Sequence, residues 1–292
     1  MRRVFIDDEK EREFQEKGYA VVPFLSKEEV RMMYDYYLTE NKLMNNYDPT
    51  YAEFSVLNAE LENRRKIFNK ITGLFLPKLD KILDNNKPII ANYVCKEPTK
   101  GMVPVHQNWA VVDEMKYTSV SVWCPLVDVT EENGTLAFVD GSHKYFRGPR
   151  GSYANRNFKD VDQLIIDNYL TYLPIKAGEA IILDDSVIHY SSINKSNSIR
   201  LAIQLIMIPA EAQGYHYTFR EENGKMFADL YAVDENYYLG MVNWKGDLSK
   251  YKLLQSFEFH NKMYQKEEFQ QIMKYGGVRK PFFKKVLEMI TG

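Results

Sequence analysis

A series of short β-rich segments fills the middle of this 292-residue chain and limits the folds open to it. Gly, Pro, Asn and Asp residues separate the segments, as is typical of proteins built from two antiparallel sheets. The expected strands cover residues 89–95, 103–112, 118–126, 136–139, 172–175, 180–183 and 200–208. We therefore predict a mainly β fold with flanking helices, of the jelly-roll or related barrel type.

Helical patterns come before this β-rich part. Ser26 and Glu29 match a capping box ahead of one helical run, and residues 58–84 form a second, in which Pro77 should bend or break the helix. Residues 144–170 show no clear periodicity and are expected to form a loop over the site. We expect a single domain, made of residues 1–88 (an N-terminal strand and buttressing helices), 89–209 (the β core, with the insertion 144–170) and 210–292 (an aromatic C-terminal extension that ends in a helix over 282–287).

Composition excludes several classes of partner. The formal net charge is only −2, which gives no electrostatic reason to expect nucleic acid or an anionic membrane. No stretch approaches the roughly 18 consecutive apolar residues of a membrane helix. Cys95 and Cys124 are too few for a disulfide scaffold and lack metal-pair spacing. We expect a cytoplasmic protein that binds a small molecule.

Two distant histidines form the most informative motif for function. His106 is followed two residues later by Asn108, and in extended backbone these two side chains point the same way. His189 continues from a second buried β segment. Two imidazoles and an oxygen donor on one face are what a mononuclear iron site with open positions needs. The pattern therefore favours His106, Asn108 and His189 as metal ligands.

Arg200 adds a charge in the middle of an alternating strand. A guanidinium on a half-buried strand needs a carboxylate partner, because an unpaired charge there is costly. A small dicarboxylate bound beside the metal would supply that partner.

These residues carry a family resemblance over roughly residues 14–209. The chain resembles the phytanoyl-CoA dioxygenase family of Fe(II)/2-oxoglutarate-dependent oxygenases in four segments: 14–22, 132–136 (ENGTL), 140–144 (DGSHK) and 189–196 (HYSSINKS) through Arg200. The resemblance implies a double-stranded β-helix that uses Fe(II), 2-oxoglutarate and O₂ to hydroxylate an aliphatic carbon, with release of succinate and CO₂.

The resemblance also implies roles for individual residues. His106 and His189 would bind iron, and Arg200 would anchor the far carboxylate of 2-oxoglutarate. Ser191 would hydrogen-bond the same co-substrate, and further pocket positions are implied at Asn92, Ser121 and Trp123.

Position 108 departs from the family, which usually has aspartate there. Asn108 could be a working neutral ligand, a carboxylate from Asp113, Glu114 or the substrate could replace it, or the metal site could be degenerate. Halogenation is disfavoured, because Asn108 would fill the space that a halide needs. If the site is degenerate, the chain would be a catalytically impaired relative that binds a small molecule or a partner. An isomerase or hydrolase that uses another metal is a third reading.

Substrate contacts are less constrained by the sequence. Trp109, Asp113 and Arg147 are candidates, with Arg147 and Arg150 either meeting an anionic substrate or lying in a solvated loop. His143 is expected to be a hydrogen-bonding loop residue, and His216 and His260 are expected to be ordinary surface or packing residues. We expect the substrate to be a small polar metabolite or a natural-product intermediate.

Overall fold

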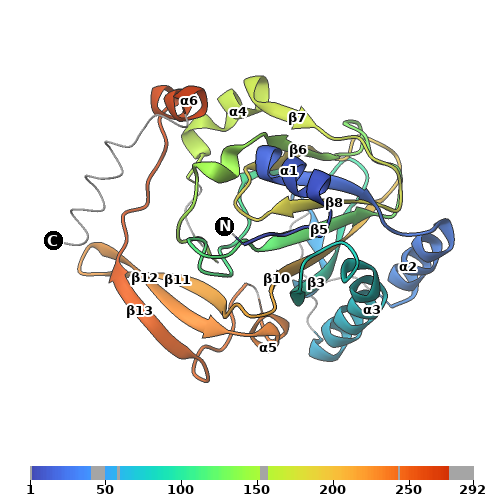
Figure 1. Cartoon of the computed structure of the whole chain (residues 1–292), viewed down its shortest axis with the longest axis horizontal. Helices are drawn as coiled ribbons and strands as arrows, with labels where there is room; N and C mark the ends of the chain where they lie inside the picture. The colour runs from blue at the N-terminus through green and yellow to red at the C-terminus, as the bar shows by residue number, and fades with distance from the viewer. Residues whose placement is uncertain (1, 41–49, 58–59, 152–156, 243, 276–292) are drawn as a thin grey trace.

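The computed structural model describes residues 2–40, 50–57, 60–151, 157–242 and 244–275 (Figure 1). Its main body contains two antiparallel sheets. The larger sheet has the strand order β1-β8-β5-β10-β3-β2 and the smaller the order β4-β9-β6-β7. The larger sheet contains β1 (Tyr19–Pro23), β2 (Glu53–Phe54), β3 (Asn86–Lys96), β5 (Val120–Pro125), β8 (Glu179–Asp184) and β10 (Arg200–Pro209); the smaller contains β4 (Val103–His106), β6 (Leu136–Val139), β7 (Leu170–Tyr172) and β9 (His189–Ser191). The prediction of a mainly β fold with flanking helices is confirmed.

Side-chain alternation along β10 gives the larger sheet two different faces. Leu201, Ile203 and Leu205 are fully buried in the cluster that also contains the apolar face of α3 (Leu61–Leu79) and residues of α2 (Lys27–Glu40). Arg200 and Gln204 alternate with these residues and therefore point to the opposite face. Burying each large apolar side chain contributes roughly 1.5–3 kcal/mol, so the helices pack stably on this face of the sheet. The opposite face, with Arg200 and Gln204, is not covered by them.

The inner face of the larger sheet packs against the smaller sheet. Trp123 and Ala202 of the larger sheet belong to the same buried cluster as Leu136 and Phe138 of β6. Tyr19 stacks on Phe138 with ring centroids 4.3 Å apart, which ties the first strand to the same interior. Polar residues on the inner face therefore lie between two sheets.

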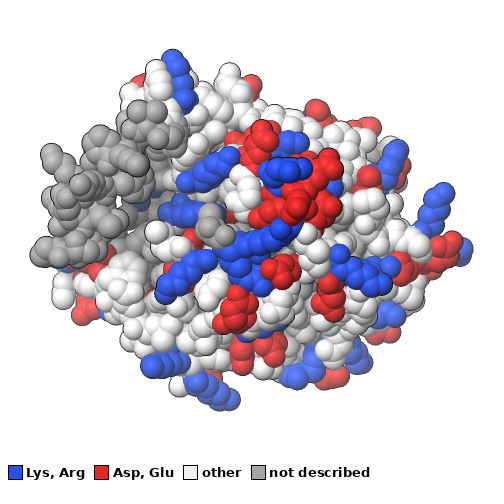
Figure 2. Space-filling view, in the orientation of Figure 1, with Lys and Arg blue, Asp and Glu red and all other residues white. Residues whose placement is uncertain are grey.

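The N-terminal helices largely follow the sequence pattern. The capping box is present, since Ser26 N donates to Glu29 Oε2 at 2.8 Å and Glu29 N donates to Ser26 Oγ at 3.2 Å. Pro77 lies inside α3, and the helix ends two residues later at Leu79. The helix α1 (Asp8–Lys17) lies across the middle of Figure 1, and acidic and basic side chains are intermixed over this area in Figure 2.

The insertion and the first β segment differ from the prediction. Within 144–170 the structure has a helix, α4 (Asp162–Asn168), with Ile165 fully buried, so this segment is not entirely loop. The expected strand 103–112 ends at His106, because the chain leaves the sheet there. Short 3₁₀ turns are η1 (Ser55–Leu57), η2 (Ser142–Lys144) and η3 (Lys159–Val161).

The C-terminal extension builds a third sheet. Strands β11 (Gly214–Glu222), β12 (Lys225–Val233) and β13 (Lys252–Glu258) pair in that order, and α5 (Glu235–Leu239) and α6 (Lys266–Tyr275) follow β12 and β13. In Figure 1 this sheet lies on the opposite side of the main body from α2 and α3. The helix expected over 282–287 falls outside the described residues. None of the described helices has both the length and the apolar character needed to span a bilayer.

Candidate functional site

The two predicted histidines lie side by side on the smaller sheet. His106 ends β4, His189 begins β9, and they are cross-strand partners. Their ring centroids are 4.1 Å apart. Strands distant in the sequence therefore bring both imidazoles to one place.

The backbone sets the same tautomer for both rings. His106 Nδ1 lies 2.8 Å from Pro104 O, and His189 Nδ1 lies 2.9 Å from Val187 O. A carbonyl can only accept, so each Nδ1 carries the proton and each lone pair is on Nε2. Burial, and then the neighbouring His106, hold the pKa of His189 well below its usual range, so that ring is neutral at pH 7. A neutral imidazole whose other nitrogen donates to a carbonyl is the usual form of a metal-binding histidine.

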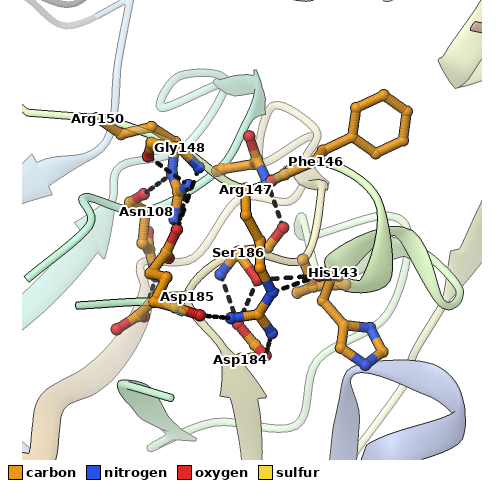
Figure 3. Close-up of polar contacts among 12 residues, drawn as sticks. Asn108, His143, Phe146, Arg147, Gly148, Arg150, Asp184, Asp185 and Ser186 are labelled. Atoms are coloured by element: carbon orange, nitrogen blue, oxygen red, sulfur yellow. Dashed lines mark hydrogen bonds and ion pairs between the residues drawn. The ribbon is translucent and has the colours of Figure 1, made fainter. Parts of the chain in front are cut away.

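Asn108 is held by hydrogen bonds rather than by strand geometry. Its Nδ2 donates to Asp185 Oδ1 at 2.9 Å, and Asn108 and Asp185 lie close together in Figure 3. The same Nδ2 donates to Ser121 Oγ at 3.0 Å. Ser121 Oγ in turn donates to Asp185 Oδ1 at 2.7 Å. The amide nitrogen therefore faces these acceptors, which leaves the amide oxygen as the atom of Asn108 suited to a metal. The two-residue spacing keeps its Cα within about 7 Å of that of His106.

Asn108 is the third donor that the motif offers. Within the described ranges, no group of three or more His, Cys, Asp or Glu side chains could hold a metal ion. The carboxylates considered as replacements are engaged elsewhere: Asp113 pairs with Lys116 at 3.1 Å, and Glu114 pairs with Arg150 at 2.5 Å. Two imidazoles and an amide oxygen fit a divalent ion, but this donor set carries no negative charge.

Arg200 is a buried cation on the inner face of the larger sheet. Its side chain is 1% exposed, and its guanidinium carbon lies 5.4 Å from the centre of the Trp123 ring. Its Nη1 makes one long hydrogen bond, 3.5 Å to Val94 O, and its Nε has no partner. In the part of the chain that the structure describes, no carboxylate pairs with it. Burial lowers the pKa of Arg200 to about 10, so it is still charged at pH 7.

Lys96, which the sequence reasoning missed, is a second buried cation beside Arg200. The two residues are cross-strand partners on β3 and β10. Lys96 Nζ donates to Ser191 Oγ at 2.5 Å and to the carbonyl oxygens of Ser191 and Ser192. Burial, and then Arg200, lower the pKa of Lys96 well below its usual range. A lysine at the end of a buried β run was the available signal.

Ser191 is occupied by these contacts. Its hydroxyl accepts from Lys96 and donates to Gly134 O at 2.7 Å. The single hydroxyl proton is therefore committed to a backbone carbonyl, and a co-substrate would have to displace one of these bonds to meet Ser191.

Three softer predicted positions line the inner face of the larger sheet. Asn92 Nδ2 lies 3.4 Å from Gln204 Oε1, and Gln204 Nε2 lies 3.4 Å from Ser121 Oγ. This polar row ends at Asp185, whose pKa burial raises to about 6. Asn92 Oδ1 is buried without a partner. The ring of Trp123 lies next to the guanidinium of Arg200.

The substrate candidates fall in three different settings. Trp109 belongs to a partly buried aromatic group with His216 and Trp244, its ring centre 5.5 Å from each of theirs. Asp113 is partly exposed on a turn. Arg147 bonds Asp184 Oδ2 at 3.0 Å and the carbonyl oxygen of His143 at 3.0 Å (Figure 3).

The expectation that Arg147 and Arg150 lie in a solvated loop was wrong. Arg147 is partly buried and Arg150 buried, and each is held in an ion pair, with Asp184 and Glu114 respectively, rather than solvated. His143 is buried and hydrogen-bonds the backbone of Gln15, in keeping with the expected hydrogen-bonding role, although its Nδ1 has no partner; burial lowers its pKa to about 4. Of the two readings expected for His216, surface or packing, the structure shows packing: it is 1% exposed among aromatic rings, and neither ring nitrogen has a hydrogen-bond partner.

Comparison with known proteins gives the family. The model of the phytanoyl-CoA dioxygenase (PhyH) family matches residues 14–202. The chain belongs to the phytanoyl-CoA dioxygenase family. Its curated relatives include phytanoyl-CoA dioxygenase domain-containing protein 1 of Danio rerio, 29% identical over 46% of this chain and 50% of the relative, and the Mus musculus protein of that name, 26% identical over 49% and 53%. The chain thus spans about half the length of these curated PhyH relatives.

Solved structures share the fold of this PhyH chain. The non-heme α-ketoglutarate-dependent carbocyclase SnoK from nogalamycin biosynthesis has a TM-score of 0.53 at 22% identity, over 72% of this chain and 86% of SnoK. HygX from Streptomyces hygroscopicus, solved with nickel and 2-oxoglutarate bound, has a TM-score of 0.52 at 12% identity, over 70% and 88%. At these identities the likeness concerns the fold alone.

Proposed function

We propose that this chain is an Fe(II)- and 2-oxoglutarate-dependent dioxygenase. It would hydroxylate an aliphatic carbon of a small metabolite or natural-product intermediate and release succinate and CO₂. One observation carries the proposal: two imidazoles meet on the smaller sheet, and on the larger sheet a buried arginine has no carboxylate partner among the described residues. Membership of the PhyH family supports it. The two facing sheets support a double-stranded β-helix.

The protein's own residues would bind and orient. His106, His189 and Asn108 would hold the metal, and Arg200 would hold the far carboxylate of 2-oxoglutarate. Lys96 would add hydrogen-bond donors at the same end of the site. Bound Fe(II) would supply the activation of O₂ that is coupled to decarboxylation of the co-substrate. The buried surroundings of Arg200 exclude water, which strengthens its attraction for a carboxylate.

The aromatic group around Trp109 is the proposed substrate wall. Trp109 directly follows Asn108, so it lies next to the proposed metal ligand in the chain. Its neighbours His216 and Tyr238 come from β11 and from α5, so the C-terminal extension contributes to this wall. A flat aromatic surface favours substrates with apolar or ring-shaped parts.

Succinate formation tests the proposal. Purified protein loaded with Fe(II) without oxygen, then given ascorbate, 2-oxoglutarate and O₂, should form succinate even without its substrate, at a slow uncoupled rate. His189→Ala should abolish this turnover, whereas His260→Ala should not, because His260 is exposed. Absence of succinate from protein shown to contain iron and 2-oxoglutarate would favour a small-molecule-binding relative instead.

A further inference from the structure

Asp185 is a buried acid in an unusual setting. Its side chain is fully buried, and its Oδ1 accepts hydrogen bonds from Asn108 and Ser121; burial raises the pKa of this carboxyl, and the Ser119 hydroxyl beside it opposes that effect. Its Oδ2 has no partner, and no lysine or arginine forms an ion pair with it within the described ranges. The preceding residue, Asp184, has the usual partners of a buried acid: it pairs with Arg147 at 3.0 Å and accepts hydrogen bonds from Ser186. Arg150 attracts the Asp185 carboxylate only from beyond ion-pair distance. A buried carboxylate without a direct ion pair is costly, so the folded protein must gain something else from it.

The proposed metal centre lacks the charge that Asp185 carries. Two neutral imidazoles and an amide leave both charges of a divalent ion uncompensated by direct ligands. Asp185 is one hydrogen bond away from that amide. An amide that donates to a carboxylate is polarised, which makes its oxygen a better donor to a cation.

We propose that Asp185 is a positioning residue of the metal centre, one hydrogen bond behind Asn108. It holds the amide with its oxygen turned away from Asp185 and toward the metal, and it supplies the negative charge that an aspartate at position 108 would have supplied directly. This inference rests on the proposed metal site. The amide thus stands at the ligand position where the family usually has an aspartate, and the carboxylate stands one hydrogen bond behind it.

The arrangement gives a sharp expectation for position 108. Asn108→Asp alone would place two carboxylates at the 2.9 Å that now separates the amide nitrogen from Asp185 Oδ1. They would have to share a proton, so the gain from a charged ligand would be partly lost. The exchange variant Asn108→Asp with Asp185→Asn restores a hydrogen bond of the opposite direction and moves the charge into direct contact with the metal.

Metal affinity measured without turnover tests the proposal. We would titrate Co(II) into metal-free protein by calorimetry, without 2-oxoglutarate or oxygen, and compare the wild type with Asp185→Asn, Asn108→Asp and the exchange variant. Outer partners of metal ligands typically contribute 10- to 100-fold in affinity. We expect Asp185→Asn to weaken binding by that factor, and the exchange variant to bind at least as tightly as the wild type.

Controls separate charge from packing. Ser121→Ala removes one hydrogen bond to Asp185 but no charge, so it should weaken binding less than Asp185→Asn does. Asp184→Asn removes a neighbouring buried charge that faces Arg147, and it should leave Co(II) affinity unchanged. Thermal melts would show that each variant is folded. If Asp185→Asn does not fold, the exchange variant still decides the question.

The outcomes are distinct. Wild-type Co(II) binding with Asp185→Asn within twofold of it would overturn this inference and leave the proposed function standing. An exchange variant that is folded but binds tenfold more weakly than the wild type would also overturn it. A wild-type protein that binds no Co(II) would remove both this inference and the metal site on which it rests.

Discussion

Replacing Arg200 by methionine should change stability and co-substrate binding in opposite directions. Burial lowers the pKa of Arg200 to about 10, whereas an arginine in water has a pKa above 12. Each tenfold change in proton affinity corresponds to about 1.4 kcal/mol, so burying this charge costs the folded protein on the order of 3 kcal/mol. Arg200→Met removes that cost and keeps an unbranched side chain. The ligand-free variant should therefore be more stable than the wild type, by up to about 3 kcal/mol.

The same change should greatly weaken 2-oxoglutarate binding. A guanidinium that binds a carboxylate in bidentate fashion makes two charge-assisted hydrogen bonds, each of which contributes about 1.5–3 kcal/mol. Loss of about 3 kcal/mol or more corresponds to at least a hundredfold rise in Kd. Urea unfolding measures the stability, and calorimetric titration of the metal-loaded protein with 2-oxoglutarate measures the affinity.

Arg150 provides the matched control. It is also a buried arginine, but it is paired with Glu114. Arg150→Met would leave that acid buried and unpaired, which typically destabilises a protein by about 3–5 kcal/mol. A loss of stability in Arg200→Met, or a 2-oxoglutarate affinity within threefold of the wild type, would refute the argument that the carboxylate partner of Arg200 comes from a bound ligand.

Two further predictions concern the surroundings of the site. Gly134→Ala should destabilise the protein by more than about 2 kcal/mol, because Gly134 has φ +81° and a Cβ there would lie 2.5 Å from Ser192 O and 2.9 Å from Lys96 Nζ. Gly73→Ala in α3 is its control and should stabilise by about 0.5–1 kcal/mol, since nothing lies within 4 Å; equal melting temperatures for the two variants would contradict the crowding argument. Burial lowers the pKa of His216 to about 4, below its value in the unfolded chain, so stability present above about pH 6.5 is lost as the pH falls toward 4. His216→Phe should remove about 2 kcal/mol of the stability difference between pH 7 and pH 5 in urea unfolding, and an unchanged difference would show that His216 does not titrate in this way.

The local signals of the site were visible in the sequence, and its long-range pairings were not. The meeting of His106 and His189 follows from two β segments that each present a histidine. Asn108 reaches its position for a different reason than predicted, because β4 ends at His106 and hydrogen bonds from the loop take over. The roles of Lys96 and Asp185 depend on strand pairing and on burial between sheets, which no local pattern of residues reveals.

The C-terminal sheet carried a signal that was overlooked. Asn223-Gly224 joins β11 to β12, and both residues have positive φ, 52° and 74°. An Asn-Gly pair between two β-like runs is the strongest short-range indication of a hairpin, because such a two-residue turn requires positive φ at both positions. The helix α4 was missed because it is only seven residues long, too short for a clear period.

The histidines and Arg200 belong to different sheets, so the distance between them is set by how the sheets pack. Ala202, fully buried two residues from Arg200, shares its cluster with Leu136 and Phe138 of the facing sheet. Under the proposed function, the packing of this interior determines how long a keto acid must be to reach both the metal and the guanidinium. Discrimination between longer and shorter dicarboxylates would then be encoded in apolar residues that never touch them.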